Sequence, residues 1–290
     1  MGILLGLLTA IGWGGSDFTA RFSAHRVGAL RTMLYMQSVG FLLLTISMHW
    51  LGGWGHLADG SGWPPWGWGF LAGSINACAT LALYRAFEVG KMANVAPLSA
   101  SYPALTLFLS WLTGDHLSSA RVVGILFILC GVAVVAGGEH APSEDSARSA
   151  QTNTRGIGLA VCAAVGFGIL FWLLGNRVVP RTGAIQAVWM IRLTSSVLTA
   201  LVIFAGAQPM QLPRGNVRWM ALGMGALDTL AFVLSNLGMQ MEQVAIISVL
   251  GSLYGAVTVG LAAIVLRERV SRLQWTGIAS IFFGILLISR

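Results

Sequence analysis

The chain has 290 residues, of which 56% are hydrophobic and only 9% are charged, and its formal net charge is +7. A soluble domain usually carries about 25% charged residues, so the composition excludes a water-soluble globular protein and indicates that lipid surrounds most of the surface. The basic residues stand singly or in small groups between apolar runs and form no stripe with interleaved aromatic residues, which argues against a nucleic-acid-binding protein.

Ten apolar runs are long enough to cross a membrane as helices, which takes about 20 residues each. The predicted spans are residues 2–21, 30–50, 66–87, 93–113, 119–138, 156–176, 184–205, 217–237, 244–266 and 271–289. The longest polar connection, residues 139–155, has the composition of a linker. The sequence therefore predicts an all-α integral membrane protein with ten transmembrane helices, divided into residues 1–138 and 156–290.

Short motifs recur in the two halves at a nearly constant shift of about 152 residues. The tripeptide GWG at 12–14 corresponds to GFG at 166–168. The other recurring pairs are Asn76 and Asp228, Tyr102 and Tyr254, Thr106 and Thr258, Gly124 and Gly277, and Gly131 and Gly284. Because five is an odd number, a second five-helix copy enters the membrane upside down. This predicts an inverted repeat with a binding site near the midplane, between the copies.

The distribution of charge predicts how the chain is oriented in the membrane. Most Lys and Arg residues fall in the connections after the odd-numbered spans, so the positive-inside rule predicts that both termini lie outside. The connection over residues 49–69 has five tryptophans and no Lys or Arg. We interpret it as an aromatic belt at the outer face.

Three charged residues inside the apolar runs are candidates for the site. Asp228 lies near the middle of its span, where an ionised carboxylate costs several kcal/mol unless it is paired or faces water. It could bind a cationic group, carry a proton or form a structural pair. Arg192 could hold a substrate carboxylate or pair with Asp228. Asp17 could belong to a gate or the site, or to a solvated helix end near Arg21.

Uncharged residues complete the predicted site. Asn76, Tyr102, Tyr254 and Trp13 could present amide, hydroxyl or ring groups to a ligand, and helix packing is the alternative role for each. Weaker candidates are Asn236, Phe167 and Trp172. Four residues that bend or loosen helices are candidate hinges, and static kinks are the alternative: Pro97, Pro103, Gly251 and Gly255.

GWG in the first span, SYP at 101–103, and LRERVS at 266–271 followed by GIASIFFGILLI resemble the EamA branch of the drug/metabolite transporter superfamily. The resemblance covers nearly the whole chain. It implies a basket of ten helices around a cavity, lined largely by the third, fourth, eighth and ninth helices. The first, second, sixth and seventh helices would close this cavity. Glu268 matches an acidic residue of the family and Asp115 stands at the equivalent place in the first copy, whereas Gly255 replaces a usual proline.

The resemblance implies transport of small metabolites, often export of amino acids or related compounds. We therefore expect a monomeric secondary transporter in the cell (inner) membrane that works by alternating access, with protons as the candidate coupling ion. A lipid-head-group flippase and an intramembrane enzyme are the alternatives. The motifs H-E-x-x-H, G-x-S-x-G and G-x-x-x-x-G-K-[ST] do not occur, and we expect no cofactor or metal.

Overall fold

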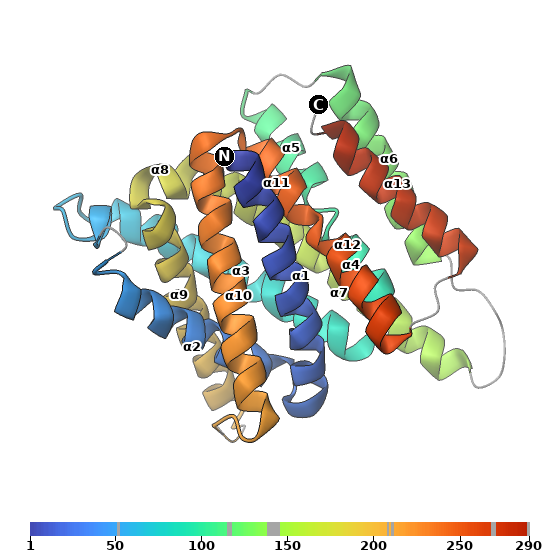
Figure 1. Cartoon of the computed structure of the whole chain (residues 1–290), viewed down its shortest axis with the longest axis horizontal. Coiled ribbons are helices and arrows are strands. Elements are labelled where there is room, and N and C mark those ends of the chain that lie inside the picture. Colours follow the sequence, from blue (N-terminus) through green and yellow to red (C-terminus); the bar gives the residue numbers. More distant parts are fainter. Residues whose placement is uncertain are drawn as a thin grey trace.

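The computed structural model describes residues 1–50, 53–114, 118–137, 146–207, 209, 212–267 and 271–288. These residues form helices and connections, with no strand among them (Figure 1). The α-helices are α1 (Gly2–Val27), α2 (Ala29–Ser47), α3 (Pro64–Val89), α4 (Met92–Ser99), α5 (Pro103–Leu112), α6 (Ser119–Gly137), α7 (Ser146–Leu173), α8 (Val179–Thr182), α9 (Ala184–Ala205), α10 (Asn216–Met241), α11 (Val244–Ser252), α12 (Tyr254–Leu261) and α13 (Arg272–Ile288). One 3₁₀ turn, η1 (Gly55–Leu57), and two π turns, η2 (Leu174–Val178) and η3 (Ala262–Leu266), complete the set.

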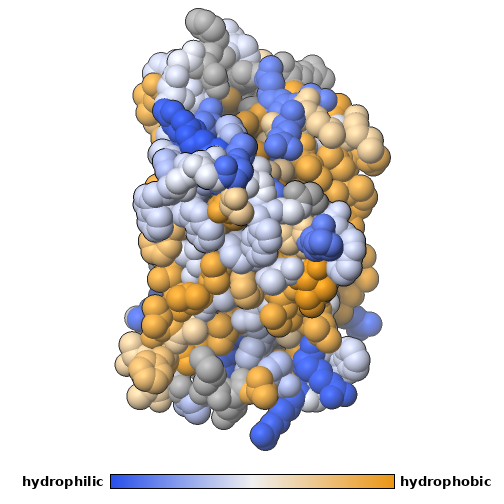
Figure 2. All heavy atoms as spheres, turned by 90° about the vertical axis from the view of Figure 1, so that its left-hand side faces the viewer, coloured by the Kyte–Doolittle hydropathy of each residue, from blue (hydrophilic) through white to orange (hydrophobic). Residues whose placement is uncertain are grey.

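The helices have the length and apolarity of membrane spans. Among the described residues, eight helical segments are long and apolar enough to cross a bilayer, and Val122–Gly131 and Trp275–Leu287 are shorter apolar helices. On the face shown in Figure 2, strongly hydrophilic residues lie mostly toward the upper and lower ends, and apolar residues cover much of the surface between them. The prediction of an all-α integral membrane protein is confirmed.

Two predicted spans are each broken into two helices. The span 93–113 becomes α4 and α5, and the break ends at Pro103, which has no backbone N–H to continue the ladder and therefore starts the new helix. The span 244–266 becomes α11 and α12, with the break at Leu253. The second break forms without proline, next to Gly255.

The predicted linker is also partly helical. Residues 138–145 lie outside the described residues, and residues 146–155 form the first turns of α7. This segment contains no glycine or proline, so nothing in it stops the helix from extending beyond the membrane.

Recurring glycines bring α6 and α13 together as antiparallel neighbours (Figure 1). A Cβ atom at Gly131 would lie 2.6 Å from the Gly277 carbonyl oxygen, and one at Gly284 would lie 2.5 Å from the Gly124 carbonyl oxygen. The two helices therefore run in opposite directions with their backbones in contact, and a larger side chain at either position would separate them.

The two halves interlock through hydrogen bonds between matched residues. The Thr106 hydroxyl donates to the Gly168 carbonyl at 3.1 Å, and the Thr258 hydroxyl donates to the Gly14 carbonyl at 3.5 Å. In each case the first helix of one half contacts the broken helix of the other half. The GWG and GFG motifs thus lie where the halves meet.

The tryptophan-rich connection between α2 and α3 is folded onto α9. The Trp54 ring meets the Trp189 ring edge-on at 5.1 Å, whereas Trp50 and Trp63 are each 76% exposed. Which side of the membrane this connection faces stays a prediction.

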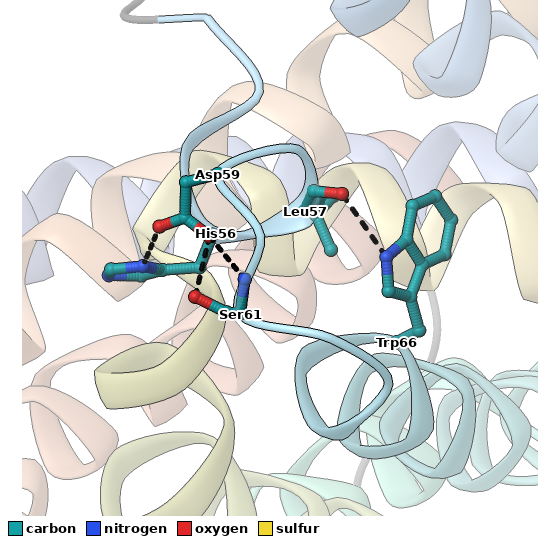
Figure 3. Close-up of polar contacts among 5 residues, drawn as sticks. All are labelled: His56, Leu57, Asp59, Ser61 and Trp66. Atoms are coloured by element: carbon teal, nitrogen blue, oxygen red, sulfur yellow. Dashed lines mark hydrogen bonds and ion pairs between the residues drawn. The ribbon is translucent and has the colours of Figure 1, made fainter.

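An acidic turn fixes the tip of this connection (Figure 3). The Asp59 carboxylate accepts hydrogen bonds from the Ser61 hydroxyl at 2.5 Å and the Ser61 backbone N–H at 2.9 Å, and lies 2.7 Å from Nδ1 of His56. These contacts, the Ser61 bonds first, lower the pKa of Asp59 to about 2. The Trp66 indole N–H donates to the Leu57 carbonyl at 3.2 Å and ties the turn to α3.

Candidate functional site

A central cavity lies where the two halves meet, and the space inside it that water-sized molecules can occupy is about 40 Å³. Its walls come from α1, α2, α3, α7, α10 and the two helix breaks. The residues that line it are Trp13, Asp17, Met36, Thr80, Leu83, Tyr84, Tyr102, Phe167, Phe171, Asp228, Phe232 and Tyr254. The resemblance implies a lining from the third, fourth, eighth and ninth helices, and the structure adds residues from the first, second and sixth predicted helices.

The lining follows from helical periodicity. Residues four apart in an α-helix lie on one face. Four such pairs line the cavity: Trp13 and Asp17, Thr80 and Tyr84, Phe167 and Phe171, and Asp228 and Phe232. Each of these helices therefore turns one face inward, which is mixed polar and aromatic on α1, α3 and α10 and aromatic on α7.

Arg192 is paired with Asp228. Its Nη2 lies 2.5 Å from Oδ2 of Asp228, and its Nη1 donates to the Gln37 side-chain oxygen at 2.7 Å. The guanidinium carbon lies 5.2 Å from the centre of the Phe232 ring, and the residue is 0% exposed. The predicted roles of Arg192 were to hold a substrate carboxylate or to pair with Asp228. In the structure it pairs with Asp228 and does not line the cavity.

Asp17 lies in the cavity wall. It is 6% exposed, and no described residue forms a hydrogen bond or an ion pair with its carboxylate. Arg21, one turn further along α1, donates instead to the Phe87 and Gly90 carbonyls at 3.2 and 2.9 Å. The prediction of a solvated helix end near Arg21 is therefore wrong, and the carboxylate faces the cavity.

Three polar candidates lie away from the cavity. The Asn76 side-chain N–H donates to the Ser195 hydroxyl at 3.2 Å, so Asn76 joins α3 to α9 behind the wall. Asn236 donates to the Ala184 carbonyl at 3.0 Å, and the Trp172 indole donates to the Thr113 hydroxyl at 3.3 Å. These residues bind helix neighbours, the alternative role expected for Asn76.

The two matched tyrosines reach across to opposite halves. The Tyr102 hydroxyl donates to the Ser248 carbonyl at 2.9 Å, and the Tyr254 hydroxyl donates to the Ser99 hydroxyl at 2.8 Å. Both rings also line the cavity. Each helix break is thus tied to the broken helix of the other half by a tyrosine that forms part of the wall.

Aromatic rings surround Trp13 at the centre of the cavity. The rings of Phe232, Phe171 and Tyr254 lie edge-on to it at 5.3, 5.5 and 6.3 Å. The Tyr102 ring is stacked on Phe171 at 4.7 Å. This arrangement gives the cavity rigid apolar walls that can also interact with a cation.

The four candidate hinges all lie in or beside the broken helices. Pro97 is inside α4, and Pro103 begins α5. A Cβ at Gly251 would lie 3.0 Å from the Trp13 ring and one at Gly255 would lie 2.7 Å from the Ala100 side chain. A backbone movement at Gly251 would therefore displace Trp13 in the cavity wall, and one at Gly255 would displace the crossing of the broken helices.

The two acidic residues that the family resemblance singled out, Glu268 and Asp115, lie outside the described residues.

Sequence reasoning missed six of the lining residues: Met36, Thr80, Leu83, Tyr84, Phe171 and Phe232. The four-residue spacing from Asp228 to Phe232 and from Asn76 through Thr80 to Tyr84 is the signal that could have found several of them. The described residues contain no group of His, Cys, Asp or Glu side chains that could hold a metal ion.

The profile of the EamA-like transporter family matches residues 1–137 and 154–290. The chain belongs to this family. The EamA-like assignment confirms the resemblance drawn from the sequence motifs, and it agrees with the apolar helices of a multi-pass membrane protein.

Two further comparisons agree with this assignment. The EamA-like chain is 25% identical over 199 residues to a protein of Synechocystis sp. described as an uncharacterized transporter, which covers 65% of this chain and 56% of that protein. The match thus spans little more than half of that relative. A solved crystal structure superimposes with a TM-score of 0.72 at 20% identity, covering 99% of this chain and 95% of the other, which shows the shared fold alone.

Proposed function

We propose that this EamA-like protein is a secondary transporter that exports a small metabolite, such as an amino acid or a related compound. The observation that carries the proposal is the central cavity. It lies between two halves that both contribute to its wall, and it combines charged, hydroxyl and aromatic groups inside a membrane protein. Ionisable residues inside a membrane are costly, and they usually mark a transport pathway.

The broken helices supply a route to alternating access. Transporters commonly bind substrate where helices are interrupted near the midplane between repeats. Here the breaks carry Tyr102 and Tyr254, each bonded to the other half. We propose that the halves rock about these breaks, with Pro97, Pro103, Gly251 and Gly255 as hinges. Opening toward either side would then require the two crossed tyrosine contacts to rearrange.

Filling the cavity tests this function. Thr80 lines the cavity, and Leu230 is 56% exposed on the outside of α10. Cells expressing the wild type, Thr80→Trp or Leu230→Trp at matched membrane levels are compared for efflux and survival. The panel consists of amino acids, their toxic analogues and cationic drugs. We expect Thr80→Trp to lose export and Leu230→Trp to keep it. Equal export by Thr80→Trp and the wild type would show that the cavity is not the pathway.

Several further properties belong to the same proposal. The orientation with both termini outside, the inner-membrane location and the monomeric state follow from charge and family resemblance. Reporter fusions at the two ends and the mass of the purified protein test them.

Protons are the proposed coupling ion, because carboxylates lie at the cavity. An imposed pH gradient that leaves efflux from proteoliposomes unchanged would contradict this coupling.

One observation favours a second candidate, a lipid-head-group flippase. A lateral apolar groove of about 320 Å³ runs between α5, α6 and α7, and Tyr102 lines both this groove and the central cavity. A lipid could therefore hold its chains in the groove and its head group in the cavity. Faster translocation of a fluorescent phospholipid in proteoliposomes than in protein-free liposomes would support this function. Equal rates would reject it.

A further inference from the structure

The charges at the cavity do not cancel. Asp228 is neutralised by Arg192, whose guanidinium also binds Gln37. Asp17 is only 6% exposed, and no described residue forms a hydrogen bond or an ion pair with its carboxylate. The residues that line the cavity include two carboxylates and no lysine or arginine. The cavity therefore carries one uncompensated negative charge whenever Asp17 is ionised.

A substrate carboxylate would find no cation there. The nearest candidate, Arg192, is 0% exposed, and its two terminal nitrogens face Asp228 and Gln37. Freeing it would leave Asp228 as a buried unpaired charge, which is strongly unfavourable. The cavity is consequently poorly suited to an anion. For a zwitterion it offers a partner to the ammonium group and none to the carboxylate.

The aromatic residues of the cavity wall also favour a cationic ligand. The Trp13 ring, one helical turn from Asp17, lies within 6.3 Å of three other rings. Rings around a carboxylate form the kind of cage that binds ammonium groups, because the faces of the rings are electronegative. They also provide apolar contact for the remainder of a small organic molecule.

We infer that the ligand of this cavity is a small organic monocation, an amine or quaternary ammonium compound with an apolar or aromatic body and no carboxylate. Its cationic group binds Asp17, and its body lies among Trp13, Phe171 and Phe232. The inference rests on the proposed function, because it assigns a substrate class to the transport cavity. It narrows that proposal from amino acids and related compounds to their decarboxylated, cationic counterparts.

Three probes that share a phenylethyl body and differ in charge test the inference. Phenethylamine is a cation, phenylalanine a zwitterion and 3-phenylpropionate an anion. Binding of radiolabelled phenethylamine to the purified full chain is measured, with the other two as competitors. We expect phenylalanine to compete at least tenfold more weakly than unlabelled phenethylamine, and 3-phenylpropionate not to compete. Absence of phenethylamine binding, or equal competition by phenylalanine, overturns the inference.

Substitutions locate the charge that matters. Asp17→Asn should weaken phenethylamine binding at least tenfold, whereas Asp17→Glu, which keeps the charge, should retain more affinity. The matched control Asp59→Asn makes the same chemical change in the exposed turn before α3 and should bind like the wild type. An unchanged melting temperature shows that Asp17→Asn is folded. Wild-type affinity in folded Asp17→Asn contradicts the inference.

Failure of the inference and failure of the proposed function give different results. If the export assay shows efflux of an amino acid while phenethylamine is not bound, the protein is a transporter and the cationic assignment is wrong. If phenethylamine binds through Asp17 and no compound is exported, the cationic site stands and the transport function is wrong.

Discussion

Arg192 and Asp228 form a buried ion pair. Asp228 corresponds to Asn76 of the first half, and an alignment of the second and seventh predicted spans matches Arg192 with Gln37. Nη2 of Arg192 lies 2.5 Å from Oδ2 of Asp228, and Nη1 donates to Gln37 itself at 2.7 Å. The amides of the first half do not pair with each other, because the Gln37 oxygen accepts from Arg192 and Asn76 donates to Ser195. Residues without charge are nevertheless accommodated at the corresponding places in the first half.

This relationship predicts the outcome of a double-mutant cycle. Arg192→Gln or Asp228→Asn alone should lower the free energy of unfolding by about 3–5 kcal/mol, because each leaves one buried charge without its partner. The double variant removes both buried charges and should recover most of the loss. Thermal unfolding in detergent measures all four proteins. A double variant no more stable than the worse single variant would show that the pair is not an independent structural unit.

Gly40 makes room for the ion pair. A Cβ atom there would lie 2.2 Å from the Thr229 hydroxyl and 3.0 Å from Nε of Arg192. Gly40→Ala should therefore displace the guanidinium and destabilise the protein by about 1–3 kcal/mol. Gly223→Ala is the control, because nothing lies within 4 Å of its Cβ position in α10. The control should be neutral or slightly stabilising. Equal melting temperatures for the two variants would contradict the assigned crowding.

The crossed tyrosine contacts predict a second cycle. Tyr254→Phe should cost about 0.5–1.5 kcal/mol, because one buried hydrogen bond is lost while the Ser99 hydroxyl still donates to the Ala96 carbonyl at 3.0 Å. Ser99→Ala should cost a similar amount, and the double variant should cost clearly less than the sum. Ser248→Ala serves as the control, because Tyr102 donates to the backbone carbonyl of Ser248, which this substitution retains. Strict additivity of the Tyr254 and Ser99 effects would mean that their hydroxyls are not coupled.

Protonation of Asp59 should not affect the turn before α3 in the physiological pH range. Its Asp59 has a pKa of about 2, compared with about 3.9 in an unfolded chain. A lowered pKa contributes stability that is fully present above the unfolded value and is lost as pH falls through the folded value. Hydrogen exchange of residues 53–63 should thus be unaffected by Asp59 protonation between pH 5 and 8, and Asp59→Asn should increase exchange throughout. Equal exchange in Asp59→Asn and the wild type would mean that the carboxylate does not hold the turn.

The membrane fold could be predicted from sequence because its causes are local. Apolar runs of sufficient length become helices in lipid, where every backbone polar group must be satisfied. Gly124 and Gly131 recur as Gly277 and Gly284, and the structure shows that the two helices carrying them pack against each other. The breaks at residues 100–102 and at Leu253 were less evident. Only the first is followed directly by a proline, Pro103, and the second depends on how the halves cross.

The site was harder to predict because it depends on the directions of side chains from distant helices. Asp17 and Asp228 could be selected, since charge in an apolar run is conspicuous. The different surroundings of these two carboxylates could not be predicted, because Arg192 reaches Asp228 only through the packing of α9 against α10. Asn76 was selected by its match to Asp228, yet it faces Ser195 behind the wall. Phe171 and Phe232 look like ordinary apolar residues until their helical faces are placed against Trp13.

Access to the cavity from both sides of the membrane tests the central claim most directly. Thr80→Cys is placed in a chain whose Cys78, Cys130 and Cys162 are replaced by alanine, and a membrane-impermeant thiol reagent is applied to one face of oriented vesicles at a time. A control chain keeps only Cys78, which lies on the outer surface of α3 and should not react. Alternating access predicts that the cysteine at position 80 reacts from each face and that an exported compound protects it. Reaction from one face only, with and without that compound, would contradict a transport cycle through this cavity.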